Sequence, residues 1–325
     1  MQVKRILSLT TSDVKRHRAV PALASTKDGT LLIAYRSGTD HVDTGDGSIR
    51  LLRSENGEKW IDKPFAPEDP EFDMRVNHGM TLLDGIVYFP YQEHVVIDNN
   101  SMCRTIIVTS DDGEKWNPLL RDNVPKFFFP YGRLFMTERK LHIPGYFIYD
   151  RIKYSHSSIR TLDQKFFNIA GEEFSIGREN SRFNEADICA SGKGFIAVVR
   201  NENENCAYIV TSMDALHWGV PLPLPFCIQA PCLLKVKDKL LLAGRELKLF
   251  QNKFGLNRGK VVGTSLRESL DNGYTWSKPL LIDEAYSWDT GYPSAIVKDG
   301  LVYVAFYSEF VRGNSNIMLA IVDVN

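Results

Sequence analysis

The sequence predicts an all-β chain folded as a six-bladed β-propeller of four-stranded antiparallel blades. Apolar runs of four to eight residues dominate, bounded by Gly, Pro, Asp and Asn, and helical periodicity is nearly absent. A turn followed by a short apolar strand recurs six times, and 325 residues divided by six leave about 54 per unit, which suits one blade with long loops. Segments 3–9 and 318–324 also have the pattern of strands. We therefore expect residues 1–325 to form a single domain closed by strands from both ends.

The repeated unit begins at a turn that is often Asp-Gly. Glycine accepts the positive φ that a tight hairpin needs, so Asp-Gly between apolar runs is a strong hairpin signal. We expect the strands that follow these turns to be the innermost strands of the blades. The third turn residues and following strands are Gly29 with TLLIAYR, Gly85 with IVYFPY, Lys140 with LHIPGY, Gly194 with FIAVVR, Lys239 with LLLAGR and Gly300 with LVYVAFY.

A second motif lies between these hairpins and ends in tryptophan. Its sharpest copy is 269–276, SLDNGYTW, and 109–116, TSDDGEKW, matches it. The copy at 53–60 has Glu for Asp, and the copy at 211–218 lacks both the Asp and the Gly; a blade near residue 160 has no copy. Ser and Asp side chains can hydrogen-bond the backbone of their own turn. We expect these segments to be fold elements on the outer face, remote from any site.

Composition excludes several classes of protein. The 39 Lys and Arg against 40 Asp and Glu give a formal charge of −1, without the basic excess of a nucleic-acid binder. Five cysteines without C-x-x-C argue against a disulfide framework and favour a reducing compartment. No signal peptide or membrane span is visible. We expect a cytoplasmic protein, or a secreted or periplasmic one if a signal was removed; the oligomeric state stays open.

Motifs of several enzyme classes are missing. The sequence has no H-E-x-x-H, no paired-cysteine metal site, no Walker loop and no G-x-S-x-G elbow. Seven histidines, at 17, 41, 78, 94, 142, 156 and 217, show no ligand spacing. We therefore expect neither a metal nor an organic cofactor, although scattered ligands could still converge in space.

Three of the hairpin strands end in arginine, namely Arg36, Arg200 and Arg245. Equivalent positions in different blades occupy equivalent places around the propeller axis, so these side chains should converge on one pocket. A guanidinium group is a planar fork suited to a carboxylate. The pattern predicts a shared anion site; the alternative is that each arginine pairs with a neighbouring acid.

The tryptophan motif resembles the Asp-box, or BNR repeat, of sialidases and related propellers. Two segments extend the resemblance to the site: 183–188, FNEADI, and 288–296, WDTGYPSAI. In sialidases an N-E segment opens the blade that ends in an anion-binding arginine, and a tyrosine opening the last blade is the nucleophile. The resemblance covers essentially the whole chain as architecture, and it implies Tyr292 as nucleophile with Glu185 as its base.

The same resemblance leaves two roles open. The family begins with an R-I-P segment whose arginine binds the substrate carboxylate, whereas this chain has one extra residue before Pro21. Either Arg18 serves in a shifted register or Arg36 takes the role. The family's acid/base aspartate lies in a loop before the first box, which makes Asp43 the first choice by spacing and Asp40 the second.

Other positions depart from the sialidase pattern. Pro293 follows the tyrosine where sialidases usually have serine, and Arg258 competes with Arg245 as the third arginine. Arg75 and Tyr131 fall near blade ends and are weaker candidates for the pocket. These features resemble the wider group of sialidase-like propellers, which includes proteins that are not sialidases.

The resemblance and the arginine pattern together imply an exo-acting glycosidase similar to a sialidase. It would cleave a terminal acidic sugar, sialic acid or similar, and its partner would be that sugar or glycan. One alternative is a non-catalytic propeller that binds glycan or protein. Another is a glycosidase for a different sugar, such as a uronic one. The identity and linkage of the sugar stay open.

Overall fold

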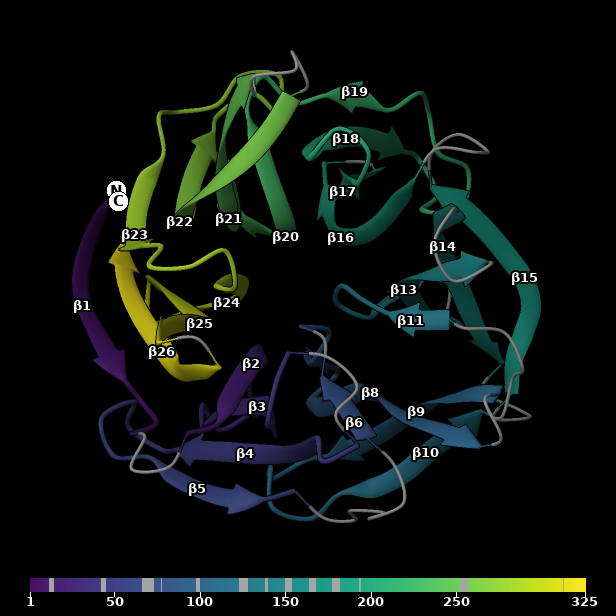
Figure 1. The fold of residues 1–325 in the computed structure, drawn as a ribbon. Coiled ribbons are helices and arrows are strands. Elements are labelled where there is room, and N and C mark those ends of the chain that lie inside the picture. The colour runs from purple at the N-terminus through teal and green to yellow at the C-terminus, as the bar shows by residue number, and fades with distance from the viewer. Residues whose placement is uncertain are drawn as a thin grey trace.

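The computed structural model describes residues 1–11, 15–41, 45–65, 73–76, 78–97, 100–122, 128–137, 140–149, 154–163, 168–176, 182–192, 194–251, 257–311 and 313–325. These residues form six antiparallel blades around a central axis (Figure 1), and none of them is helical. The predicted six-bladed all-β fold is confirmed. Among the described residues no helix is long and apolar enough to cross a membrane.

Each blade has four strand positions from the axis outward, and in blades 2 and 3 the innermost position is split into two short strands. Blade 1 contains β2(His17–Ser25), β3(Leu31–Gly38), β4(Ser48–Ser54) and β5(Ile61–Pro64). Blade 2 contains β6(Asp73–Val76), β7(Thr81–Leu83), β8(Ile86–Ile97), β9(Asn100–Ser110) and β10(Asn117–Asp122). Blade 3 contains β11(Phe128–Pro130), β12(Phe135–Thr137), β13(Lys140–Tyr149), β14(Tyr154–Asp163) and β15(Asn168–Ile176). Blade 4 contains β16(Phe183–Ser191), β17(Gly194–Asn201), β18(Cys206–Ser212) and β19(Leu222–Pro223). Blade 5 contains β20(Cys227–Val236), β21(Lys239–Gln251), β22(Asn257–Ser269) and β23(Leu280–Glu284). Blade 6 contains β24(Gly291–Lys298), β25(Leu301–Val311), β26(Asn314–Asp323) and β1(Gln2–Ser8).

The strands that follow the six repeated turns are the second strands of the blades, so the expectation that they are innermost was wrong. Figure 1 shows β2, β16, β20 and β24 nearest the axis instead. The physical reason lies in burial. Every residue of β3 is buried, and its first five residues, 31–35, form the continuous apolar run that the sequence pattern detects. The innermost strands are interrupted by prolines and polar residues at their first positions and therefore have a weaker apolar pattern.

Each blade buries both of its faces against its neighbours. Among the described residues, six apolar clusters occur, and each lies between two adjacent blades. Along β3, Leu32 and Ala34 enter the cluster shared with blade 2, while Ile33 and Tyr35 enter the cluster shared with blade 6. Successive residues of a strand face opposite sides, so a strand buried on both sides needs apolar residues throughout.

Four innermost strands break their register near their first residues. The breaks lie at 19–22 in β2, 183–186 in β16, 229–232 in β20 and 291–294 in β24. Three of these bulges hold a residue with positive φ directly before a proline, namely Val20 (51°), Ala230 (50°) and Tyr292 (47°). A bulge bends its strand and redirects a side chain. These bulges therefore set which residues face the end of the axis.

The two ends of the chain meet in blade 6. Strand β1 pairs with β26 from Gln2 opposite Asp323 to Ser8 opposite Met318. Figure 1 shows both termini side by side at the outer edge of this blade. The pairing covers the outer edge of β26 and closes the ring.

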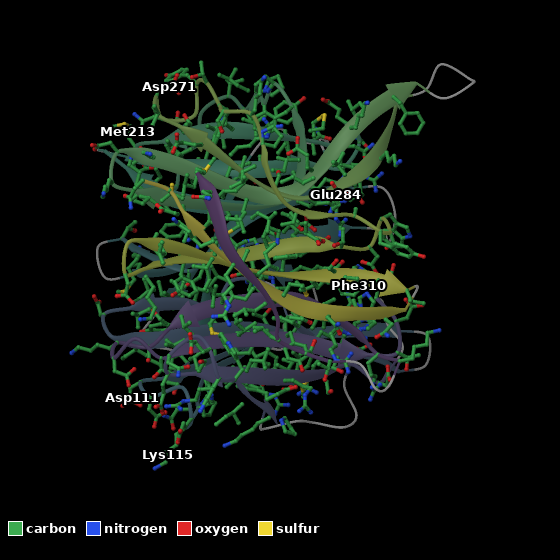
Figure 2. All side chains as sticks on the ribbon, turned by 90° about the vertical axis from the view of Figure 1, so that its left-hand side faces the viewer. Asp111, Lys115, Met213, Asp271, Glu284 and Phe310 are labelled. Carbon is green, nitrogen blue, oxygen red and sulfur yellow. A yellow bond between two sulfur atoms is a disulfide. The ribbon has the colours of Figure 1, made fainter. Side chains whose placement is uncertain are left out.

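The four tryptophan motifs form turns between the third and fourth strands of their blades. In each turn the serine Oγ accepts a hydrogen bond from a backbone N–H three or four residues later. In the copy at 211–218, Asp214 accepts two backbone N–H groups just as Asp112 does, so this copy keeps its aspartate and our contrary interpretation was wrong. Figure 2 shows Asp111, Asp271 and Met213 at one end of the barrel-shaped molecule and Phe310 at the other. Residues 164–167, where a copy is missing, lie outside the described residues.

One disulfide departs from the sequence-based expectation. Cys206 at the start of β18 is bonded to Cys227 at the start of β20, and it joins blade 4 to blade 5. Cys103, Cys189 and Cys232 are free. Disulfides persist mainly in oxidising compartments, so this bond removes the basis for expecting a reducing one.

A largely buried ion pair joins the inner parts of three blades. Arg133 Nη2 lies 2.7 Å from Asp187 Oδ2, and this carboxylate also accepts the backbone N–H of Arg133 and of Leu233. Burial disfavours the charge of Asp187, but Arg133 and then His78 hold the pKa of this carboxyl well below its usual range. The network connects blades 3, 4 and 5 at their innermost strands.

Reducing the disulfide should destabilise the fold. Cys206 and Cys227 enclose a sequence separation of 21 residues, and closing such a loop in the unfolded chain is worth about 3 kcal/mol. We expect Cys206→Ser to lower the thermal midpoint by several degrees, and dithiothreitol to do the same to the wild type but not to the variant. Cys189→Ser is the matched control. A wild-type midpoint that ignores the reductant would contradict the bond.

Removing Asp187 should destabilise the fold far more than removing a surface acid. Asp187→Ala leaves Arg133 charged and buried, and such a broken pair costs about 3–5 kcal/mol. Urea unfolding followed by tryptophan fluorescence measures the loss. Glu55→Gln, which removes an exposed partner of Arg53, should change the free energy of unfolding by less than about 1 kcal/mol. Equal effects of the two substitutions would show that the Arg133–Asp187 pair has no special role.

Candidate active site

A tyrosine of blade 6 and a glutamate of blade 4 are in contact through their side chains. The Tyr292 hydroxyl, at the bulge of β24, donates a hydrogen bond of 2.8 Å to Glu185 Oε1, at the bulge of β16. Glu185 is 3% exposed. Burial, and then the neighbouring Glu185 charge, raise the pKa of Tyr292 to about 12. The phenol therefore keeps its proton at neutral pH, and its hydrogen bond points at a group that can accept it.

Arg200 contacts both members of this pair. Its Nη1 lies 2.9 Å from Glu185 Oε1 and 3.5 Å from the Tyr292 hydroxyl. Burial disfavours the charge of Arg200, but the Glu185 carboxylate keeps the pKa of this guanidinium above its ordinary value. Negative charge can move between the phenol oxygen and the carboxylate while remaining beside the same cation. Glu185 Oε2 is buried and has no hydrogen-bond partner among the described residues.

Arg245 supports the ring of Tyr292 from blade 5. Its guanidinium carbon lies 4.8 Å from the ring centroid, a cation–π distance. Its Nε donates to the Thr290 carbonyl at 2.6 Å, and its Nη2 donates to the Tyr307 hydroxyl at 3.3 Å. These contacts hold Arg245 against the backbone before Tyr292 and against the neighbouring Tyr307 hydroxyl. The positions of Arg245 and Tyr292 therefore depend on each other.

The backbone at this bulge is unusual for an aromatic residue. Tyr292 has a φ of 47°, and Gly291 before it has a φ of 99°. A non-glycine residue at positive φ is uncommon and must be stabilised by its surroundings. A Cβ at Gly291 would lie 3.2 Å from the Cβ of Arg245, so only glycine fits this approach without displacement.

The guanidinium group of Arg36, which we expected in the arginine cluster, forms an ion pair with Asp73. Its Nε and Nη2 donate to the Asp73 carboxylate at 3.0 to 3.2 Å, and its Nη1 donates to the Asp40 carbonyl at 2.7 Å. Both members of the ion pair are almost fully buried. For Arg36, the alternative of pairing with a neighbouring acid is therefore the one that the structure has.

Arg18, the alternative to Arg36 for the first arginine of the sialidase pattern, donates hydrogen bonds to Ser315 and, among the described residues, to neither Tyr292 nor Glu185. Its side chain is half-buried beside Ser315 and lines a separate surface pocket with Arg16 and Arg50. The reason is strand alternation. His17, one residue earlier in β2, faces Asp289 and the site, so Arg18 must face the opposite side.

Tyr146 of blade 3 lies beside the pair, and Arg75 of blade 2 lies near Tyr146. Tyr146 lies close enough to Glu185 that burial and this charge raise its pKa, and Arg75 also influences it. The guanidinium of Arg75 lies 5.8 Å from the centroid of Phe129, which stacks on Tyr146. The sequence named Arg75 as a weak candidate, but nothing in it indicated Tyr146. Tyr131, the other weak candidate, is buried against His78, and the side chain of Arg258 lies outside the described residues.

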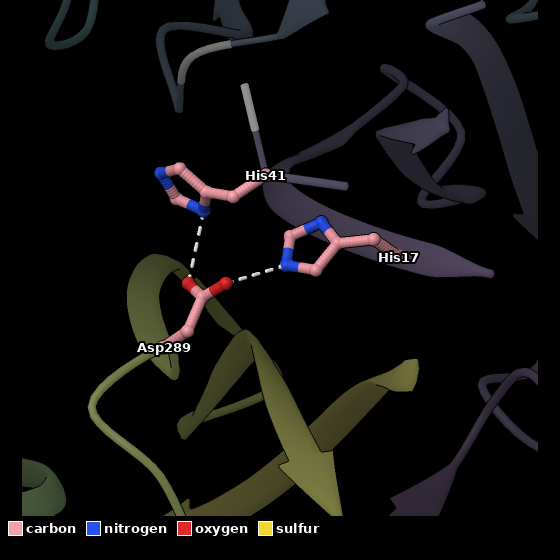
Figure 3. A group of neighbouring side chains, drawn as sticks. All are labelled: His17, His41 and Asp289. Atoms are coloured by element: carbon pink, nitrogen blue, oxygen red, sulfur yellow. Dashed lines mark hydrogen bonds and ion pairs between the residues drawn. The ribbon is translucent and has the colours of Figure 1, made fainter. Parts of the chain in front are cut away.

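Two histidines and an aspartate form a cluster beside Tyr292 that the sequence did not indicate. His17 Nε2 lies 2.7 Å from Asp289 Oδ2, and His41 Nδ1 lies 2.9 Å from Asp289 Oδ1 (Figure 3). The Tyr307 hydroxyl donates to the same carboxylate. Burial disfavours the charge of Asp289, but the hydrogen bond from His17 and the neighbouring His41 hold the pKa of this carboxyl well below its usual range. The residues are 272 positions apart at the extremes, so no local spacing could indicate them.

A pocket of about 500 Å³ opens next to this cluster. Tyr292 and Glu185 do not line this pocket, but the ring of His41 on its wall lies 6.5 Å from the ring of Tyr292. Asp40 lies on the pocket wall, and its Oδ1 accepts the backbone N–H of His41 at 2.7 Å. Asp43 lies outside the described residues. The residues that line the pocket are Lys15, Thr39, Asp40, His41, Trp288, Asp289, Glu309 and Gly313.

Comparison with known proteins identifies the fold. No family model and no curated protein matches the sequence. A protein of unknown function from Dyadobacter fermentans superposes with a TM-score of 0.79 at 16% identity, over 100% of this chain and 99% of the other. The GH93 α-L-arabinofuranosidase of Fusarium graminearum, in complex with arabinobiose, gives 0.72 at 10% identity over 99% and 98%. The Hadza microbial sialidase Hz136 gives 0.66 at 18% identity over 94% of this chain and 66% of its own.

The fold is the six-bladed propeller of sialidases and related glycosidases. At these identities the likeness describes the fold alone. The neighbours with this fold include a sialidase and an α-L-arabinofuranosidase.

Replacing Gly291 should disturb the site more than replacing another glycine. Gly291→Ala forces a side chain into a positive φ and against Arg245, which should cost at least about 1 kcal/mol of stability. Thermal unfolding measures this loss. Gly219→Ala, where the added Cβ meets its nearest atom at an ordinary 3.4 Å, is the control. If both variants melted together, the close packing of Arg245 on Gly291 would not be needed.

Proposed function

We propose that this protein is an exo-acting glycosidase that cleaves a terminal acidic sugar, with Tyr292 as nucleophile and Glu185 as its base. The observation that carries the proposal is the hydrogen bond of 2.8 Å from the Tyr292 hydroxyl to Glu185, with Arg200 in contact with both groups. Neighbours with the same fold include a sialidase from Trypanosoma rangeli in complex with sialic acid. The proposed reaction needs no metal and no organic cofactor.

The proposed chemistry has two steps. The Tyr292 oxygen bonds to the anomeric carbon while its proton passes to Glu185, which lies within the 2.6–3.2 Å range of a general base. The bond to the leaving oxygen breaks, and that oxygen takes a proton from a second group of the site. Water then attacks the glycosyl–tyrosine and restores the enzyme. Sialidases use a tyrosine in place of the second carboxylate of most glycosidases, and a neutral phenol does not repel a substrate carboxylate.

Arginines would bind the carboxylate of the sugar. Arg200 and Arg245 border Tyr292, and a charge-assisted contact of each with a carboxylate is worth about 1.5–3 kcal/mol. In this proposal Arg75 takes the place expected for Arg36, because Arg36 is already paired with Asp73. The second proton-transferring group comes from the loop after β3, in which the sequence indicates Asp43 or Asp40.

A second candidate function is a glycosidase for a neutral sugar such as arabinofuranose. One specific observation favours it, namely the pairing of Arg36 with Asp73, which leaves the cluster with fewer cations for an anion than the sequence predicts. The likeness to the Fusarium graminearum α-L-arabinofuranosidase agrees with this candidate.

Turnover of a glycoside panel tests both candidates. We expect hydrolysis of the 4-nitrophenyl glycoside of sialic acid or of a uronic acid, and not of arabinofuranose. Tyr292→Phe should lower kcat by more than about 1,000-fold with unchanged circular dichroism, because the nucleophilic oxygen is lost. Tyr274→Phe, at an 82% exposed tyrosine, should leave turnover unchanged.

The other outcomes are equally clear. Hydrolysis of only the arabinofuranoside would replace the acidic sugar by the second candidate. Binding of sialyl or uronic oligosaccharides without turnover of any glycoside would indicate a non-catalytic propeller. Full activity of Tyr292→Phe would remove the tyrosine from the mechanism.

A further inference from the structure

We propose that His41, oriented by Asp289, is the group that donates a proton to the leaving oxygen and later accepts one from water. This inference rests on the proposed function and deepens it, because it assigns the second proton-transferring role to a histidine and not to an aspartate. The observation that motivates it is the His41–Asp289 contact of 2.9 Å at the edge of the pocket that adjoins Tyr292.

The position of Asp289 is fixed from several sides. His17, which is fully buried, lies 2.7 Å from one carboxylate oxygen, and Tyr307 donates to the other. The backbone N–H of Asp289 donates to the Ser287 hydroxyl at 2.9 Å. A carboxylate held in this way can impose one orientation on the imidazole that contacts it. We assign His17 and Asp289 as positioning residues, since the substrate-facing member of the cluster is His41.

The contact with Asp289 also determines which nitrogen of His41 is available. The Asp289 carboxylate lies 2.9 Å from Nδ1 in an ion-pair contact that does not have hydrogen-bond geometry. The negative charge favours a proton on Nδ1, so Nε2 is the nitrogen that can exchange another proton. In Figure 3 the second ring nitrogen of His41 lies on the far side from Asp289. The side chain is 24% exposed, whereas His17 is fully buried. Nε2 of His41 is therefore the nitrogen that a substrate in the pocket can reach.

His41 is also well placed relative to Tyr292. The two rings are 6.5 Å apart, so both groups can reach atoms of one glycosidic bond. Asp40, by contrast, already accepts the backbone N–H of His41 at an exposed position, where it shapes the loop that carries the histidine. Among the described residues, the charged and titratable groups around His41 are Asp289, His17, Asp40, Lys15, Glu309 and Tyr292.

The same three residues have the donor types of a divalent metal site, with ligand atoms within 4.8 Å of one another. Two features favour the histidine–aspartate pair. A metal-ligating histidine almost always donates its other ring N–H to an acceptor, yet the buried Nδ1 of His17 has no hydrogen-bond partner among the described residues. Arg245 donates to Tyr307, which donates to Asp289, so a cation already lies beside this carboxylate.

The proton and bond balance is complete without another reactant. In the first step, protonated His41 gives the Nε2 proton to the leaving oxygen as its bond to the anomeric carbon breaks, and the Tyr292 proton moves to Glu185. In the second step, neutral Nε2 takes a proton from water as the water oxygen bonds to the anomeric carbon. The bond from that carbon to Tyr292 breaks, and Glu185 returns the proton to the phenol oxygen.

The dependence on the leaving group tests this role. A proton donor matters most when the leaving oxygen is strongly basic, so His41→Gln should lower kcat/KM by about 100-fold or more for the methyl glycoside. The same variant should lose less than tenfold for the 2,4-dinitrophenyl glycoside, whose leaving group departs without a proton. The sugar is sialic acid, or arabinofuranose if the wild type hydrolyses only that. His41→Asn is a second variant in case the first folds poorly, and circular dichroism checks both.

Parallel variants separate the competing assignments. Asp40→Asn and Asp43→Asn test the aspartates that the sequence indicates, and neither should lose more kcat/KM for the methyl glycoside than for the 2,4-dinitrophenyl glycoside. Asp289→Asn should reproduce the His41→Gln pattern more weakly. Equal losses for both glycosides in His41→Gln would overturn the proposal, as would the leaving-group pattern in Asp40→Asn or Asp43→Asn. Loss of wild-type activity on dialysis against a chelator, with recovery in Zn²⁺, would overturn it in favour of a metal site. If the wild type hydrolyses no glycoside, the proposed function fails first and this role fails with it.

Discussion

The structure depends on one constraint, that each blade must bury both of its faces. A strand that is buried on both sides needs apolar residues on both, as Leu31 to Tyr35 of β3 show. A sheet of this kind is stable only between two others, so the blades must form a closed ring, and β1 must pair with β26 to complete the last one. The candidate site lies at the bulges of the innermost strands, where the regular pairing is interrupted.

The bulges of the innermost strands turn this architecture into a site. They interrupt the regular pairing of β16 and β24 at the points where Glu185 and Tyr292 lie. The same bulge in β2 and β20 holds Val20 and Ala230, which carry no polar group. The strained backbone is thus a repeated feature of the fold, and the residue type placed on it decides whether a blade contributes chemistry.

The sequence predicted the fold well because the signals for it are local and repeated. Asp-Gly turns and tryptophan motifs depend on residues within one turn, and they recur at blade spacing. It also indicated that Tyr292 and Glu185 belong together, through a resemblance of short segments. It failed where distant residues decide. Arg36 pairs with Asp73 from the next blade, strand alternation turns Arg18 away, and His17 meets Asp289 only because the ring closes.

The pairing of β1 with β26 makes blade 6 the part of the ring that opens first when the two chain ends are pulled apart. Gln2 lies opposite Asp323, so both chain ends leave the β1–β26 pair at the same edge. Tension between the chain ends would break the β1–β26 hydrogen bonds one after another, starting from Gln2 and Asp323, and would not load all of them at once. Force transmitted through the termini would therefore peel β1 away first, while the interfaces between the remaining blades stay unloaded.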